Sequence, residues 1–192
     1  TFELTPAPNL IGWIASNEPA KNYLGDYNLH AGTYSDTEYY GLVQFNLSAI
    51  PAGTQIQFAS IELIGLNRER LSSGGQWQLA LLDGAIDRGW ATTTFRQVRD
   101  TAAAQIIGGV LGADDLDVSR VNTFEFKPEQ LKDLQQRLSQ GAVAFRLEGP
   151  TVGGNNLFTW DAGTQQGGLG FKPVLRLGTG PFAPTPTATF VA

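Results

Sequence analysis

The sequence predicts an all-β protein, built as an antiparallel, jelly-roll-like β-sandwich with one short α-helix. Three observations support this fold class. About eight to ten short segments alternate between apolar and polar residues, which is the pattern of strands with one buried face. The 192 residues include 23 glycines and 10 prolines, which favour turns over long helices. Only one segment repeats its apolar residues at the three-and-four spacing of an amphipathic helix.

We expect three parts along the chain. Residues 1–8 form an extended N-terminal lead, residues 9–180 form the β-sandwich domain, and residues 181–192 form a Pro/Thr-rich extended tail or linker. A domain of this length is large enough to bury a sizeable core. The alternation of proline and threonine in the tail excludes a helix and favours polyproline or β-edge geometry.

The segment Tyr39–Leu66 has the clearest strand pattern and predicts a β-hairpin. Val43 and Phe45 fall on one face of its first half, and Gln44 falls on the other. The second half alternates in the same way. Between the halves, the sequence Ile-Pro-Ala-Gly at 50–53 supplies a fixed φ and a residue free to adopt positive φ. We therefore expect two antiparallel strands, each buried on one face only.

The other β elements follow from the same patterns. Alternation predicts strands, a run of threonines predicts a short β segment, and Gly-rich or Asn-rich stretches predict loops. The expected elements are a strand at Leu10–Ala15, a loop-rich stretch at Ser16–Tyr34, strands at Gln76–Leu82 and Thr92–Phe95, a long loop at Ala102–Asp117, and strands at Val121–Phe126, Val143–Leu147, Leu157–Trp160 and Pro173–Leu177.

A helix is expected at Pro128–Gln140. Its first residue is a proline, which suits the first turn of a helix, and Gly141 suits the position just after its end. Three leucines form one apolar stripe that can pack on the sandwich, Leu131, Leu134 and Leu138.

Composition limits the classes of partner. The formal net charge is −5, from 13 basic and 18 acidic residues, and no basic run occurs. Because nucleic-acid binding needs a positive surface, we expect no nucleic-acid partner, and the same reasoning disfavours a strongly acidic polysaccharide. The absence of cysteine excludes disulfides and thiolate metal sites. No apolar run of about 18 residues occurs, so we expect no membrane span.

A series of short motifs follows the strands in a fixed order. They are GWIAS at 12–16, NYLG at 22–25, LHAG at 29–32, VQFNLS at 43–48, IPAG at 50–53, ASIEL at 59–63 and KPVLRL at 172–177. In this order, from Ala7 to Gly178, they resemble the disaggregatase-related (DNRLRE-type) β-sandwich domains, which are grouped with carbohydrate-binding modules. Gln44, Asn46 and Phe95 stand where that family commonly has arginine, aspartate and tryptophan.

The resemblance implies an extracellular or cell-surface module, because the family occurs in large secreted proteins, often repeated and joined by Pro/Thr-rich linkers. It also implies that carbohydrate is a candidate ligand. A glycan site needs an exposed aromatic platform, since aromatic faces pack on the C–H faces of sugar rings. Trp13, Trp77 and Trp90 are expected to be structural residues rather than binding residues. The candidates for the platform are Tyr23, Tyr27, Tyr34, Tyr40 and Trp160.

Catalytic and metal sites have little support. His30 is the only histidine, and no nucleophile, zinc or phosphate-loop motif occurs, so we expect no enzyme and no cofactor. The acidic stretch with Asp114, Asp115 and Asp117 could bind calcium, which prefers several oxygen ligands. It lacks the glycine and the distal glutamate of an EF-hand loop, and solvated loop acids are an equally simple interpretation.

The chain ends suggest self-association. Both ends are β-prone and carry almost no charge, so an extended end can add to the sheet edge of another copy. The residues assigned to this contact are Phe2, Leu4, Phe182, Thr187, Thr189, Phe190 and Val191. Our leading hypothesis is a non-catalytic structural or adhesive module that assembles head to tail with copies of itself or with neighbouring domains. The alternative is a carbohydrate-binding module for a surface or secreted polysaccharide.

Overall fold

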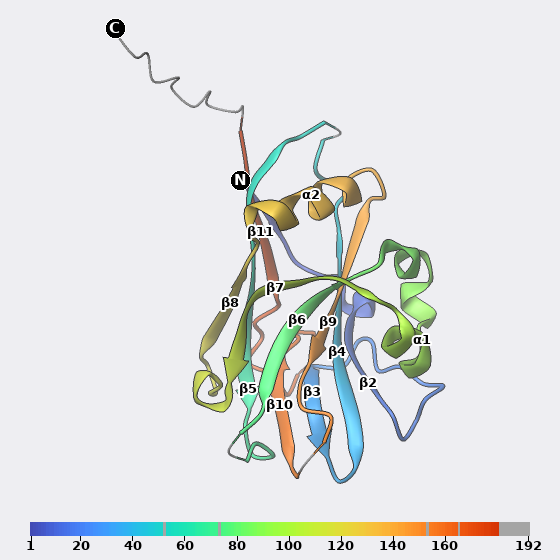
Figure 1. The fold of residues 1–192 in the computed structure, drawn as a ribbon, viewed down its shortest axis with the longest axis vertical. Coiled ribbons are helices and arrows are strands. Elements are labelled where there is room, and N and C mark those ends of the chain that lie inside the picture. The colour runs from blue at the N-terminus through green and yellow to red at the C-terminus, as the bar shows by residue number, and fades with distance from the viewer. Residues whose placement is uncertain (52, 73, 153, 165, 181–192) are drawn as a thin grey trace, which may run out of the picture.

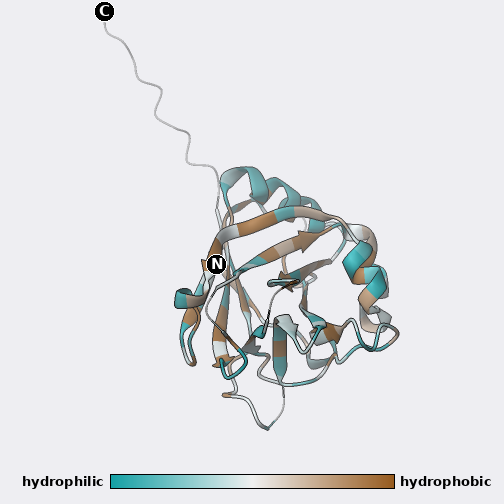
Figure 2. Cartoon of the chain, turned by 60° about the horizontal axis from the view of Figure 1, so that its bottom comes forward, coloured by the Kyte–Doolittle hydropathy of each residue, from teal (hydrophilic) through white to brown (hydrophobic). Residues whose placement is uncertain are grey.

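The protein is an all-β, antiparallel, sandwich-like fold, as the sequence predicts (Figure 1). The structure, a computed structural model, describes residues 1–51, 53–72, 74–152, 154–164 and 166–180. Each pairing between its strands is antiparallel. Apolar residues gather on the strands, and the outer surface of the helices is mostly hydrophilic (Figure 2).

The described residues form eleven strands and two α-helices. The strands are β1 Phe2–Leu4, β2 Ile11–Ala15, β3 Asn28–Tyr34, β4 Thr37–Asn46, β5 Ile56–Asn67, β6 Gln76–Leu82, β7 Ala103–Gly112, β8 Val121–Glu125, β9 Ala142–Glu148, β10 Asn156–Asp161 and β11 Val174–Thr179. The α-helices are α1 Phe95–Asp100 and α2 Pro128–Arg137, and three short 3-10 helices are η1 Pro8–Leu10, η2 Gly84–Thr92 and η3 Ala113–Asp115.

The strands form one continuous sheet that curls over into two layers, which we call the small sheet and the large sheet. The small sheet has the order β1–β11–β5–β8. The large sheet has the order β10–β3–β4–β9–β6–β7, with β2 also beside β4. Strand β5 belongs to both, because it pairs with β11 and β8 over Ile56–Ile64 and with β10 at Gly65 and Asn67. The long β5 therefore carries the chain around the corner of the sandwich.

The main core lies between the two sheets. Large side chains from both sheets are fully buried there, among them Phe45 of β4, Ile61 of β5, Phe145 of β9 and Trp160 of β10. Their alternation along each strand places one apolar side chain inward at every second position. The alternating pattern that predicts the strands is thus also the pattern that builds the core.

The predicted hairpin at Tyr39–Leu66 is wrong, although both of its strands exist. Strand β4 pairs with β2, β3 and β9 in the large sheet, and β5 pairs with β11, β8 and β10. The two strands face each other across the core instead of lying side by side. Alternation determines which face of a strand is buried, but it carries no information on the pairing partner.

The expectation that β4 is buried on one face only is also wrong. Its outward residues Tyr40 and Leu42 belong to a second apolar cluster, which covers the outer face of the large sheet. Trp90 of η2 and both Phe95 and Val98 of α1 form the cover. The central strand of the large sheet therefore lies between two apolar layers.

Three further elements differ from the sequence prediction. The stretch Ser16–Tyr34, expected to be rich in loops, ends in β3, which pairs with β10 and β4. Thr92–Phe95, expected as a β segment, ends η2 and begins α1, because Thr94 and Gln97 form a reciprocal capping box. The expected loop at Ala102–Asp117 contains β7, which is the outer strand of the large sheet and pairs with β6. Its small residues give a weak strand pattern, and Gly108 lets it pass close to the backbone of Phe124 in β8.

The predicted helix is confirmed as α2, which ends at Arg137. Its leucine stripe faces the core, with Leu134 fully buried and Leu131 and Leu138 packed against the cluster. The NH of Gly141 donates to the carbonyl of Arg137 at 3.0 Å, and its φ of +76° suits a glycine after a helix.

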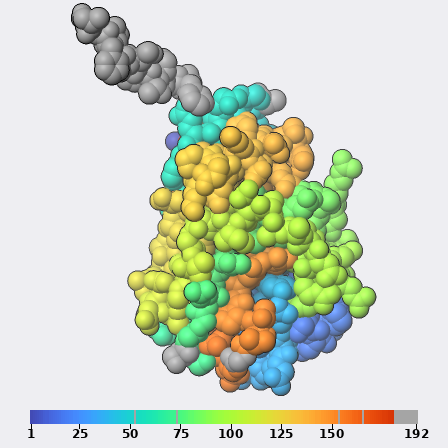
Figure 3. Space-filling view, in the orientation of Figure 1, coloured from blue at the N-terminus to red at the C-terminus, as the bar shows by residue number. Residues whose placement is uncertain are grey.

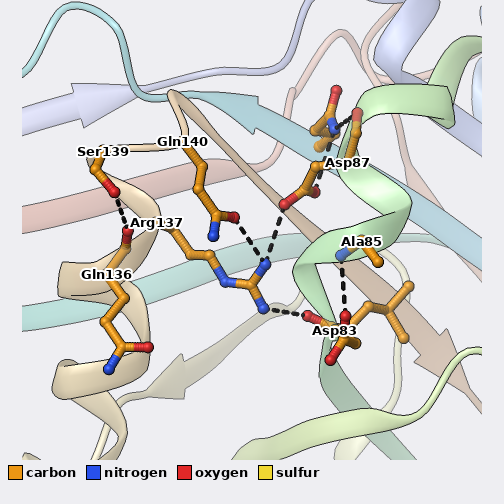
Figure 4. A network of polar contacts seen from close by, with 9 residues as sticks. Asp83, Ala85, Asp87, Gln136, Arg137, Ser139 and Gln140 are labelled. Atoms are coloured by element: carbon orange, nitrogen blue, oxygen red, sulfur yellow. Dashed lines mark hydrogen bonds and ion pairs between the residues drawn. The ribbon is translucent and has the colours of Figure 1, made fainter.

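A buried ion pair attaches α2 to the helical layer on the large sheet (Figure 4). Arg137 Nη1 lies 3.2 Å from Asp87 Oδ2, and both side chains are almost fully buried. Arg137 Nη2 donates to the carbonyl of Leu82 at 2.8 Å, and Gln44 Nε2 donates to the carbonyl of Asp87 at 2.9 Å. Burial raises the pKa of Asp87, although the Gln44 hydrogen bond and the Arg137 charge oppose this shift. The pair therefore links α2, η2, β4 and β6.

We predict that Arg137→Met lowers the free energy of unfolding by about 3–5 kcal/mol, because it leaves the buried Asp87 carboxylate without its partner. Adding Asp87→Asn to that variant should restore part of the loss, since no buried charge remains. Urea unfolding of both variants at pH 7 measures the effect. A double variant that is less stable than the single variant would contradict this account.

Candidate functional site

The five aromatic candidates do not form one platform. Trp160 is fully buried, and its Nε1 donates to Asn122 Oδ1 at 2.8 Å. Tyr40 is also buried, stacks on Phe95 with ring centroids 5.3 Å apart, and donates its hydroxyl to Glu38. Both residues are therefore excluded from an exposed platform. Alternation predicts that they lie in strands, but it cannot show that both faces of β4 are covered.

Tyr34 and Tyr27 are half-buried at separate places. The guanidinium carbon of Arg70 lies 4.4 Å from the ring centre of Tyr34, so a cation already occupies one face of that ring. The backbone of Gly167 packs on the ring of Tyr27, where a Cβ would come within 3.0 Å of it. One face of each ring is therefore already covered by another part of the chain.

Tyr23 belongs to the most platform-like arrangement on the surface. Its ring stacks on Trp13 with centroids 3.9 Å apart and planes 9° from parallel. The loop carrying Tyr23 lies directly on β2, where its NH donates to the carbonyl of Trp13 at 2.9 Å and the NH of Gly25 donates to that of Ile11 at 2.8 Å. A Cβ on Gly12 would lie 2.1 Å from the carbonyl oxygen of Tyr23, so glycine permits this approach.

Polar side chains surround this pair, which we call the aromatic stack (Trp13 and Tyr23). Trp13 Nε1 donates to Asp26 Oδ2 at 2.6 Å. Glu18 accepts hydrogen bonds from Lys21 and from the Tyr23 hydroxyl, and these partners lower its pKa. Both residues of the aromatic stack are half-exposed, and the Glu18 carboxylate and the Lys21 ammonium group lie beside Tyr23. The sequence analysis assigns Trp13 a structural role and does not predict its stacking on Tyr23. That contact depends on how the loop at residues 16–27 folds.

His30 lies behind the aromatic stack and has structural partners. Its ring meets Trp13 edge-on at 5.0 Å, and its Nδ1 is 2.7 Å from Thr159 Oγ1. Burial lowers the pKa of His30 to about 4; the charge of Asp26 opposes this shift, and that of Arg70 adds to it. The imidazole is therefore neutral near pH 7 and packs between strands.

The proposed calcium ligands do not converge. Asp115 Oδ2 accepts from the NH of Gly112 at 2.8 Å, and Asp117 Oδ1 accepts from the NH of Val118 at 2.8 Å and pairs with Arg68. These two contacts lower the pKa of Asp117. In the part of the chain that the structure describes, no group of three or more His, Asp or Glu side chains is arranged to hold a metal ion. The acidic stretch forms a turn around η3 in which Asp115 and Asp117 bond backbone NH groups, and the calcium assignment to Asp114, Asp115 and Asp117 stays a prediction.

The N-terminal segment is part of the domain. It forms β1, which pairs with β11 so that Phe2 lies opposite Leu177 and Leu4 opposite Leu175. Phe2 and Leu4 are partly buried and pack against the main core. Among the described strands β1 pairs only with β11, and its outer edge is therefore an edge of the small sheet. The other assembly residues, Phe182, Thr187, Thr189, Phe190 and Val191, lie outside the described residues.

The small sheet also presents an outer surface, which we call the open face. At its centre, Arg176 forms ion pairs with Glu3 and Glu62 across three neighbouring strands. Val121 and Phe171 lie at its border, and each is 52% exposed. A shallow groove of about 410 Å³ crosses this surface. The open face combines neutralised charges with exposed apolar groups, in contrast to the covered face of the large sheet.

A cavity of about 640 Å³ lies beside the buried ion pair, lined in part by Asp87, Arg88, Ser139 and Gln140 (Figure 4). The charge of Asp87 is paired with Arg137, and the hydroxyl of Ser139 donates to the carbonyl of Gln136 at 2.9 Å. Ser139 thus bonds a backbone carbonyl rather than a base that would activate it. These contacts indicate a structural role for the polar network, which links elements of the fold.

Comparison with models of known protein families and with curated protein sequences finds no match to this chain. The resemblance to DNRLRE-type domains therefore depends only on the motifs quoted above. Within the described residues, no helix is both long and apolar enough to cross a membrane.

We predict that His30 makes stability depend on pH between about 6.5 and 4. The unfolded chain binds a proton at His30 below a pKa of about 6.5, whereas the folded protein binds it only near 4, so stability should fall as pH decreases by up to about 1.4 kcal/mol per unit. Unfolding curves of the wild type and of His30→Gln across this range measure the difference. A constant difference between the two proteins would contradict the prediction.

Proposed function

We propose that the chain is a non-catalytic extracellular structural or adhesive module that joins copies of itself head to tail through its terminal segments. The observation that carries this proposal is the edge strand β1. The N-terminal segment has been incorporated into the small sheet, and its outer edge offers unpaired main-chain groups to an added strand. The C-terminal segment, residues 181–192, supplies the strand in this arrangement.

The positions of the two ends determine the form of such an assembly. Because β1 is antiparallel to β11, the N-terminus lies beside the exit of the chain after Thr179 (Figure 1). A C-terminal segment that adds to β1 of another copy extends the small sheet from one domain to the next. The contact is heterologous, so repetition produces a filament or a layer unless two copies exchange segments reciprocally. In such an assembly, the small sheets of successive copies would flank each added strand, and their open faces would form part of the outer surface.

The contact at the edge of β1 is small, so we expect a single joint between two copies to have low affinity. Strand β1 contains three residues, Phe2–Leu4, and Pro6, which has no NH donor, follows two positions later. Each main-chain hydrogen bond contributes about 0.5–1.5 kcal/mol. Stable layers would therefore require many joints in parallel, as in a repeated surface protein.

We predict that removing residues 181–192 abolishes association without loss of thermal stability, because the sandwich core lies outside this segment. A finer test replaces Thr187 and Thr189 by proline, which removes two NH donors, and uses Thr187→Ser with Thr189→Ser as the matched control. Sedimentation velocity and electron microscopy measure the assemblies. Particles that persist after the deletion, or an equal loss in the serine control, would exclude this role for the segment.

A second candidate function is binding of a neutral polysaccharide at the aromatic stack. It is favoured by the half-exposed stacked rings of Trp13 and Tyr23 beside Glu18 and Lys21. An aromatic face takes up the apolar side of a sugar ring, and the neighbouring charged groups can bond its hydroxyls. This arrangement also agrees with the ligand class that the resemblance to DNRLRE-type domains implies.

For this second function, we predict that Tyr23→Ala weakens binding to a neutral glycan by about tenfold or more, since the stacking surface is lost. Tyr34→Ala is the control, because Arg70 already covers a face of that ring. Titration with soluble β-glucan, xylan and mannan, followed by tryptophan fluorescence, measures the affinities. Failure to bind all three glycans, or an equal effect of both variants, would argue against a glycan site at the stack.

A further inference from the structure

An apolar groove lies between the start of β5 and α2. Its lining includes Ile56, Pro128, Leu131, Gln55, Gln57 and Gln135, and its volume is about 620 Å³. Side chains of these two segments lie next to each other at one end of the molecule (Figure 3).

The groove is held open by a fixed framework. Gln135 Oε1 accepts from the NH of Ile56 at 2.8 Å, and Gln135 Nε2 donates to the carbonyl of Thr54 at 2.7 Å. One side chain of α2 thereby clamps both main-chain positions that lead into β5. Because Ile56 belongs to the main core, the floor of the groove is anchored to the sandwich.

The chain itself leads into this groove. Thr179 at the end of β11 lies opposite Ile56, which lines the groove. One residue later, the carbonyl of Gly180 accepts a hydrogen bond from Gln57 Nε2 at 3.2 Å, and Gln57 also lines the groove. The described part of the chain therefore ends at the rim of the groove, at Gly180.

The chemistry of the following residues matches the groove. Residues 181–184 have the sequence Pro-Phe-Ala-Pro, and residues 181–192 contain no charged side chain. A phenylalanine ring provides a large apolar surface. Proline-rich segments also dock into apolar grooves with a low entropic cost, because proline restricts them before binding.

We propose that this groove is the docking site of the chain's own C-terminal segment, with Phe182 as the anchor between Ile56 and Leu131. A segment attached at the rim has an effective concentration in the millimolar range or above, which favours docking within one molecule over docking between molecules. This inference goes beyond the proposed function and holds whether or not copies associate.

The absence of cysteine allows a direct test by disulfide trapping. The pair Lys132→Cys with Ala183→Cys keeps Phe182 and Leu131 and places one cysteine in the groove lining. It should form an intramolecular disulfide about tenfold or more faster than the control pair Gln136→Cys with Ala183→Cys. Gln136 is an exposed residue of α2 that does not line the groove. Non-reducing electrophoresis and intact mass measure the rates, and urea should remove the difference between the pairs.

Equal rates for the two pairs would overturn the proposal. A covalent dimer formed by the groove pair would also overturn it, because it would show exchange of the segment between copies.

Chymotrypsin provides a second measurement on chains without cysteine. Cleavage after Phe182 should be slower than cleavage after Phe190 in the wild type, and Leu131→Asp should accelerate only the first, whereas Gln136→Asp should change neither. Sedimentation of the same samples reports association separately, so a failure of the assembly proposal remains distinguishable.

Discussion

The fold depends on the packing of β4 against β5 across the main core. These two strands carry the strongest alternating patterns in the chain, and each presents its apolar face to the other from an opposite sheet. Strand β5 also pairs with strands of both sheets, so it holds the small sheet and the large sheet together. Strands β2, β3 and β9 pair with β4, and β8, β10 and β11 pair with β5, while β1, β6 and β7 extend the sheet further out. Because this packing buries most of the large apolar residues in the core, those residues support the fold and are not exposed for binding.

The two outer faces then have different roles. The large sheet is covered by η2 and α1, and the buried pair of Asp87 and Arg137 attaches this cover to α2. The small sheet keeps its outer surface, the open face, and an edge at β1 that no other described strand pairs with. The binding surfaces that we propose lie on the small sheet, on the aromatic stack of Trp13 and Tyr23, and at the groove beside α2. All three are formed by chain ends, loops or edges on a rigid support.

Both ends of the domain meet at one corner, and this geometry connects the functional proposals. The edge of β1, the end of β11 and the groove at Ile56 and Leu131 lie on neighbouring elements, because β1 pairs with β11 and β11 pairs with β5. The proposed docking engages Phe182, and the proposed joint between copies engages residues 187–191. Anchoring within one molecule and joining between molecules can therefore use different parts of residues 181–192.

The sequence by itself determined the fold class, most strands, the helix α2 and its buried leucine stripe, because period-two and three-and-four patterns record which side of an element is buried. It also placed Tyr23 among the surface candidates. Only the tertiary structure decided that β4 and β5 face each other, that Tyr40 and Trp160 are buried, and that Trp13 stacks on Tyr23. These facts depend on which distant segments cover each face, and local periodicity carries no record of a partner far along the chain.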